Sequence, residues 1–162
     1  MKFNAMRPLT ISFLAAACFG WALMTWAAPA AAQTSHPRIE GRWKTIDDET
    51  GRVKSIVEIT KRNGKYYGKV VELFRLPNED QNPKCTDCTD DRKNQPALGM
   101  EIVRGMVQQG SKAEWEDGTI CDPKNGKIYD CEMWFEPGKP NELKVRGYFY
   151  FVYRTQTWVR VK

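Results

Sequence analysis

The segment KIYDCEMWFEPGKPNELKVRGYFYFV, residues 127–152, decides the fold of this chain. In both of its halves apolar and polar side chains alternate, which is typical of β-strands that turn one face to a core. The apolar sets are Tyr129, Cys131, Met133 and Phe135 in the first half, and Leu143, Val145, Phe149 and Phe151 in the second. The residues PGKPN between the halves favour a turn, so the segment is predicted to form an antiparallel hairpin.

Similar hairpin signals continue outward along the chain. Asn63-Gly64 and Asn125-Gly126 mark tight turns, because both residue types tolerate positive φ. Further strands are expected over residues 41–46, 53–60, 65–76, 100–107, 114–115, 119–123 and 155–161. Because no amphipathic helix is predicted after residue 32, about eight short strands must close on themselves to hide their edges. The sequence therefore predicts an all-β, antiparallel, up-and-down barrel, a shape that can hold one small ligand.

The first residues have the three-part layout of a secretory signal. MKFNAMR is basic, residues 9–28 are apolar, and APAAAQ supplies small side chains around Ala32. Cleavage is expected after Ala32, which leaves a flexible polar tail over residues 33–40 and one barrel domain over residues 41–162. Retention of the apolar stretch as a membrane anchor is the alternative. With cleavage, the protein is exported to the periplasm or secreted, and its mature form has no membrane span.

Removal of this segment takes Lys2 and Arg7 and no acidic residue, so the formal net charge falls from +5 to +3. The remaining basic residues are interspersed with acidic ones and form no run with aromatic residues. A nucleic-acid partner is therefore not expected. The mature length of about 130 residues suits one domain, and a monomer is expected.

Several segments carry a resemblance to a known family. They are GRWKTIDDETGRVKSIVEI (41–59), GKYYGKVVEL (64–73), CTDC (85–88), DPKNGKIYDC (122–131), LKVRGY (143–148) and RTQTW (154–158). In this order they resemble the bacterial family of exported proteins catalogued as domain of unknown function 2147. The resemblance implies a lipocalin-like or calycin-like barrel in the bacterial envelope, with no established activity. Cys121 and residues 149–153 depart from the family pattern.

The GRW segment is also similar to the Gly-x-Trp start of the lipocalins. That similarity implies that Trp43 closes one end of the barrel beneath an arginine near the end of the chain, Arg160 or Arg154, through a cation–π contact. The positions expected to be structural, from this similarity and from the turns, are Gly41, Trp43, Asp122, Gly126, Trp158 and Arg160.

Loss of Cys18 with the signal leaves Cys85, Cys88, Cys121 and Cys131, and four cysteines in an oxidising compartment indicate disulfides. The sequence leaves all three connectivities open. A two-residue turn at 125–126 would put Cys121 opposite Asp130 and turn Cys131 to the other sheet face. A direct bridge between Cys121 and Cys131 therefore needs a bulge or a longer loop, whereas a bridge from Cys131 to the CTDC segment would pin the long loop to the sheet.

Other chemistries of the CTDC segment are disfavoured. Asp87, Asp90 and Asp91 surround the two cysteines, and acidic neighbours raise a thiol pKa, which opposes redox catalysis. A structural zinc site needs four ligands, and the single histidine, His36, lies in the polar tail. Neither a metal nor another cofactor is expected.

Catalysis by carboxylates is the next possibility. The acids near two predicted hairpins are Glu114, Glu116, Asp117, Asp122 and Asp130, and such groups can act as acid and base. Asp is equally common at turns, because its side chain accepts hydrogen bonds from nearby backbone amides. Without a suitably placed histidine there is no Ser-His or Cys-His nucleophile pattern. No catalytic residue is assigned.

Aromatic residues on two strands indicate either a packed core or a ligand pocket. The candidate lining residues are Tyr67, Val71, Arg146, Tyr148, Phe149 and Phe151, with Arg146 beside Tyr148 as a polar handle. The sequence favours non-catalytic binding of a small apolar or amphipathic molecule, or of another envelope component. The alternative is a thiol-active or hydrolytic envelope enzyme.

Overall fold

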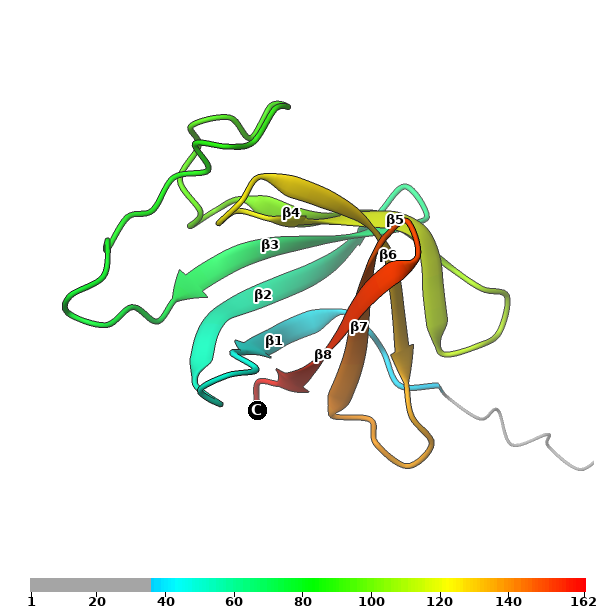
Figure 1. Ribbon diagram of the computed structural model, residues 1–162. Coiled ribbons are helices and arrows are strands. Elements are labelled where there is room, and N and C mark those ends of the chain that lie inside the picture. The colour runs from blue at the N-terminus through cyan, green and yellow to red at the C-terminus, as the bar shows by residue number, and fades with distance from the viewer. Residues whose placement is uncertain (1–35) are drawn as a thin grey trace, which may run out of the picture. The chain divides into compact units, whose positions relative to one another are not determined.

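The computed structural model describes residues 36–162, which form one closed antiparallel barrel (Figure 1). The expected signal peptide at 1–32, including Ala32, lies outside the described residues. The strands are β1 (Gly41–Ile46), β2 (Val53–Arg62), β3 (Lys65–Leu73), β4 (Glu101–Gln108), β5 (Glu114–Asp122), β6 (Lys127–Phe135), β7 (Glu142–Phe149) and β8 (Val152–Arg160). Each strand pairs with the next, and β8 returns to β1, so the predicted up-and-down barrel is confirmed.

Turn chemistry explains most of the strand ends. The turn between β2 and β3 consists of Asn63 and Gly64, both at positive φ, as the sequence predicts. The turn between β5 and β6 is longer than predicted, because Asp122 pairs with Lys127 and leaves four residues, 123–126, in the loop. Cys121 therefore pairs with Ile128 and not with Asp130.

Two strand boundaries differ from the prediction. Residues 114–115 and 119–123 do not form separate strands, because a bulge at 116–117, with Asp117 at a φ of 60°, lets β5 continue past them. The strand predicted over 142–152 ends at Phe149 instead, since Tyr150 and Phe151 form a turn and β8 begins at Val152. The sequence pattern misses this turn because neither residue is a usual turn former.

Aromatic side chains fill one end of the barrel. Trp43 and Trp115 both pack against Phe135, with ring centroids 5.8 Å apart in each pair, and Tyr66 packs edge-on against Trp115. Trp43 and Trp115 are fully buried, and the Trp43 indole donates a hydrogen bond of 2.8 Å to the carbonyl of Ile39. We call this the closed end of the barrel.

Residues 36–162 form one compact unit, in which each strand hydrogen-bonds to its two neighbours around the ring. This unit is therefore self-contained as a folding unit. Between residues 36 and 162, no helix has the length and hydropathy needed to cross a membrane.

Candidate ligand-binding cavity

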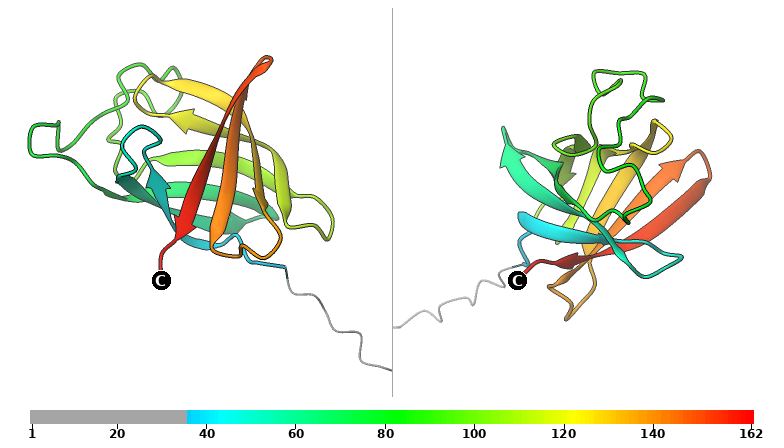
Figure 2. Two further views of the ribbon diagram at one scale, coloured as in Figure 1. Left: turned by 60° about the horizontal axis from the view of Figure 1, so that its bottom comes forward. Right: turned by 90° about the vertical axis from the view of Figure 1, so that its left-hand side faces the viewer.

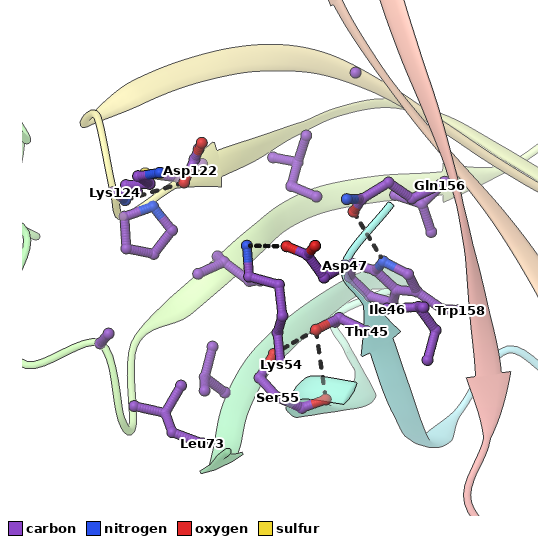
Figure 3. Close-up of a pocket in the computed structure, with 18 of the residues that line it drawn as sticks. Thr45, Ile46, Asp47, Lys54, Ser55, Leu73, Asp122, Lys124, Gln156 and Trp158 are labelled. Atoms are coloured by element: carbon purple, nitrogen blue, oxygen red, sulfur yellow. Dashed lines mark hydrogen bonds and ion pairs between the residues drawn. The ribbon is translucent and has the colours of Figure 1, made fainter. Parts of the chain in front are cut away.

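A cavity of about 840 Å³ occupies the barrel away from the closed end. Its apolar wall includes Ile46, Leu73 and Trp158, which Figure 3 labels, together with Val70, Ile120 and Val145. Trp158 and Val145 are almost fully buried, so they form the deep part of the wall. A volume of this size is within the range of pockets that bind small molecules.

Two polar pairs interrupt the apolar wall. The hydroxyls of Thr45 and Ser55 lie 2.7 Å apart and share a hydrogen bond, and both residues are buried. The Trp158 indole donates a hydrogen bond of 3.4 Å to the side-chain oxygen of Gln156 (Figure 3). A largely apolar pocket with a few polar groups is suited to an amphipathic molecule that needs orientation as well as burial.

The mouth of the cavity is charged. A polar recess there is lined by Asp47, Glu49, Lys54, Asp122, Lys124, Asn125 and Arg154. Lys54 lies 3.5 Å from Asp47, and the Arg154 guanidinium donates a hydrogen bond of 2.8 Å to Asp48. Hydrogen bonds from the backbone and hydroxyl of Thr50 lower the pKa of Asp47 to about 2, so this carboxylate is ionised at neutral pH. The mouth thus places charged side chains above the apolar walls of the cavity.

The structure places only one of the six predicted pocket residues in the cavity wall. Phe149 lines the mouth, whereas Phe151 lies in the turn and is 94% exposed. Tyr67 and Val71 do not line the cavity, because the alternate residues Gly68 and Val70 are the buried ones on β3. The prediction for these two residues is wrong because alternation did not say which of the adjacent Tyr66 and Tyr67 faces inward, and the buried one is Tyr66.

Arg146 and Tyr148 are also absent from the cavity wall, which corrects the prediction of a polar handle inside. They lie on the strand face opposite to Val145, where Arg146 packs over the ring of Trp134 at 4.6 Å. Arg146 also donates hydrogen bonds to the hydroxyls of Tyr148, at 3.1 Å, and Thr155, at 2.8 Å. Partial burial and a hydrogen bond to the Glu132 carboxylate raise the pKa of Tyr148. The group is an outer surface cluster.

The residues that do line the cavity were missed for the same reason. Leu73, Ile120 and Gln156 carry no motif, and only their position on the inner face of a strand identifies them. For Ile120 and Gln156 the signal is the alternation itself, which becomes readable only when the inner face of each strand is known. Leu73 instead reaches the cavity because a bulge in β3, opposite Ile56 and Val57, breaks the alternation after Val70.

Of the positions expected to be structural, Trp158 lies in the deep part of the cavity wall, and the others lie at the two ends of the barrel. At the closed end, the Arg160 guanidinium lies 4.1 Å from the centroid of the Trp43 ring, and Gly41 adjoins Arg160. At the mouth, Asp122 accepts hydrogen bonds from the backbone N–H of Lys124 and the side chain of Asn125, at 3.0 and 3.1 Å. Asp122 thus holds the β5–β6 turn.

Within residues 36–162, one disulfide joins Cys85 to Cys88 in the long loop between β3 and β4. Cys121 and Cys131 are free thiols and are buried, which corrects the prediction that all four cysteines form disulfides. The register explains the difference, because Cys131 pairs with Gly118 while Cys121 pairs with Ile128, so the two point to opposite faces of the sheet. The Sγ atom of Cys121 instead lies 3.8 Å from that of Cys88.

Charged contacts hold this loop against the barrel. Arg104 of β4 donates two hydrogen bonds to Asp91, of 2.7 and 2.8 Å. Arg92 is buried, and its guanidinium bonds to Asp90, which lowers the pKa of Asp90 to about 2. These contacts surround the disulfide, and Cys85 and Cys88 are themselves at most 1% exposed. An external substrate therefore has no access to the disulfide in this conformation.

Within residues 36–162, no group of three or more His, Cys, Asp or Glu side chains is placed to hold a metal ion. Among the acids considered for catalysis, Asp122 is engaged in its turn and Asp117 forms part of the β5 bulge. The geometry brings no pair of them together in the apolar part of the cavity.

Comparison with known proteins supports the architecture. Residues 41–160 match the family described as "Uncharacterized protein conserved in bacteria (DUF2147)". Among solved structures, a Helicobacter pylori protein described as belonging to the lipocalin family is similar, with a TM-score of 0.63 and 18% identity over 77% of this chain and 84% of that one. At this identity the likeness shows the fold. No curated protein sequence matches the chain.

Proposed function

The chain belongs to the DUF2147 family of bacterial proteins, and from this premise we propose that it binds a small amphipathic molecule in its barrel without changing it chemically. The observation that carries the proposal is the cavity of about 840 Å³, with an apolar wall and a charged mouth. Its lipocalin-like fold is compatible with this role.

Chemistry at the disulfide is the less favoured function. A thiol-active enzyme needs an accessible sulfur with a lowered pKa, whereas Cys85 and Cys88 are buried and burial raises the pKa of the Cys121 thiol. The cavity, in contrast, is open to solvent at the mouth, where Phe149 is about half exposed.

Export is part of the proposal. The basic start, the apolar residues 9–28 and the small residues near Ala32 support it, and the disulfide between Cys85 and Cys88 is consistent with an oxidising compartment. We propose that the exported form is a monomer in the periplasm or outside the cell.

Native mass spectrometry of the protein purified from its own cells tests the binding function. We expect a discrete mass above that of the polypeptide that disappears on denaturation, and its value would begin to identify the ligand. A native mass equal to that of the polypeptide, together with no binding of long-chain fatty acids or anilinonaphthalene sulfonate, would contradict the proposal.

A further inference from the structure

The turn between β7 and β8 displays aromatic side chains to solvent. Phe149 pairs with Val152, which leaves Tyr150 and Phe151 as a two-residue turn. Tyr150 is 86% exposed and Phe151 is 94% exposed, and Val152 and Tyr153 are each about 60% exposed. Contiguous apolar exposure of this kind on a small protein usually marks an interaction site.

The conformation of this turn is unfavourable for its residues. Tyr150 has a φ of 56°, a region that favours glycine or asparagine. The β2–β3 turn of the same barrel uses Asn63 and Gly64 at its positive φ positions, which is the usual solution. Tyr150 packs edge-on against Phe149, with ring centroids 4.9 Å apart, but both Tyr150 and Phe151 leave most of their surface in solvent, so they bury little for the strain of the turn. Residues that break a local rule without stabilising the fold are candidates for function.

The turn stands at the mouth of the cavity. Phe149, Val152 and Tyr153 line the mouth, so the exposed side chains continue directly from the cavity wall. Figure 2 shows the β7–β8 hairpin projecting beyond the neighbouring strands. A ligand that enters or leaves the cavity therefore passes beside this hairpin.

Basic side chains lie directly behind the aromatic turn. The Lys127 amine is 5.6 Å from the centroid of the Phe149 ring, and the Arg146 guanidinium is 4.7 Å from that of Tyr153. Lys127 forms no ion pair with any of the described residues, whereas Arg146 is paired with Glu132 at 3.6 Å, so Lys127 is the cation available to a partner. Aromatic side chains in front of a lysine match the membrane interface, where rings lie at the headgroup level and cations meet lipid phosphates.

We propose that the β7–β8 hairpin docks the mouth of the barrel onto a lipid membrane, with Tyr150 and Phe151 entering the boundary between headgroups and acyl chains. The inference rests on the proposed function, because a membrane is the reservoir of amphipathic molecules that such a cavity would take up or deliver. The unpaired Lys127 amine behind the aromatic turn favours a membrane as the occupant, because lipid phosphates can meet the amine while the rings lie at the headgroup level.

Flotation of the unit 34–162 with vesicles of phosphatidylethanolamine and phosphatidylglycerol tests the proposal. The test variant is Tyr150→Asn combined with Phe151→Gly, which gives the turn the residues that its backbone prefers. We expect the wild type to float with the vesicles. The affinity of the variant for the vesicles should fall by about tenfold or more, since two aromatic side chains lose their burial in lipid. The matched control is Leu98→Ser, which removes an exposed apolar side chain from the β3–β4 loop and should leave flotation unchanged.

A rescue variant and a solution assay complete the test. Tyr150→Trp should float as the wild type does, because tryptophan also prefers the interface. The Tyr150→Asn/Phe151→Gly variant should still bind anilinonaphthalene sulfonate in solution, which separates loss of membrane docking from loss of ligand binding in the cavity. Equal flotation of the wild type and the Tyr150→Asn/Phe151→Gly variant, or no flotation of the wild type, would overturn the docking proposal. Failure of all variants to bind the probe would count against the ligand-binding function instead.

Discussion

The guanidinium of Arg160 lies 4.1 Å from the centroid of the Trp43 ring and also donates hydrogen bonds to the backbone carbonyls of Glu40 and Pro140. Since Trp43 and Arg160 pair across the β1–β8 seam, these contacts fasten the strand that closes the barrel. Arg160→Gln should lower the free energy of unfolding by about 1–3 kcal/mol, through loss of the cation–π contact and of the charged hydrogen bonds.

Urea denaturation of the variant measures this loss. Arg62→Gln is the control, because Arg62 covers the Tyr67 ring at 4.0 Å and pairs with Glu101 at 2.6 Å on the exposed surface, where such contacts together should contribute about 1 kcal/mol or less. Probe affinity in the cavity should stay unchanged, since Arg160 lies at the closed end. Equal loss of unfolding free energy in both variants would mean that the Arg160–Trp43 contact stabilises the barrel no more than an ordinary surface contact does.

Two glycines at positive φ should respond differently to alanine. A Cβ atom at Gly126, with a φ of 68°, would lie 2.2 Å from the backbone of Asp87, whereas one at Gly138, with a φ of 76°, would meet nothing within 4 Å. Gly138→Ala should cost about 1 kcal/mol from backbone strain alone. Gly126→Ala should cost about 2 kcal/mol or more, because the disulfide loop must also move away. Thermal unfolding of the two variants gives the comparison. A similar loss of stability in both would show that the loop carrying Asp87 moves away from Gly126 at little cost.

Filling the cavity should block binding without unfolding the barrel. Ile120 lines the cavity, while its neighbour Thr119 faces the other side of β5, where it pairs with Arg104. Ile120→Trp should weaken binding of anilinonaphthalene sulfonate by about tenfold or more, and Thr119→Trp should leave it nearly unchanged. Circular dichroism checks that both variants keep their fold. Equal affinity in the two variants would place the probe outside the cavity.

Thiol chemistry gives another prediction. Without reductant, the unit 34–162 should contain two thiols that react with iodoacetamide only after denaturation, because Cys121 and Cys131 are buried. Cys121 lies 3.8 Å from Cys88, so its thiolate can attack the Cys88 sulfur, form a Cys88–Cys121 disulfide and release Cys85 as a thiolate. Burial raises the pKa of the Cys121 thiol, so this exchange should be slow at neutral pH and faster at alkaline pH. Mass mapping of the disulfide in samples held at each pH tests it, and Cys121→Ala should show no exchange.

Acid should weaken the contribution of Asp90. The bond with Arg92 lowers the pKa of Asp90 from 3.8 to about 2, so the unfolded chain binds the proton more readily than the folded one. The stability that this carboxylate provides is therefore complete above about pH 4 and is lost as the pH falls towards about 2. Asp90→Asn should destabilise the protein at pH 6, and its difference from the wild type should shrink towards pH 2 in urea titrations. Asp87→Asn is the control, because its exposed side chain forms no ion pair within residues 36–162. A difference for Asp90→Asn that stays constant with pH would contradict this account.

The fold was predictable because its signals are local. Alternation along 127–135 and the Asn63-Gly64 turn each follow from a few neighbouring residues, and repeated hairpins without a helix leave a barrel as the natural closure. The turn at Tyr150-Phe151 was not predicted, because neither residue type favours the backbone conformation of a tight turn, in which Tyr150 has a positive φ.

The site was less predictable because strand alternation does not say which face is inside. On β3, Gly68 faces inward and its neighbour Tyr67 faces outward. A Cβ atom at position 68 would lie 3.0 Å from the side chain of Val103, so close packing requires glycine there. The cysteine arrangement likewise depends on distances across the fold, since the contact between Cys88 and Cys121 joins the long loop to β5. Neither spacing nor composition carries that information.

The closed end of the barrel also has a practical consequence. The carbonyl of Ile39 accepts the hydrogen bond from Trp43, and Val161 donates a backbone hydrogen bond of 2.9 Å to Arg42, so the first and last described segments meet at the closed end. A tether joined to either segment would hold the protein on a sensor surface with its cavity facing outward. Immobilised protein oriented in this way would present its mouth to added lipids or vesicles in a uniform direction.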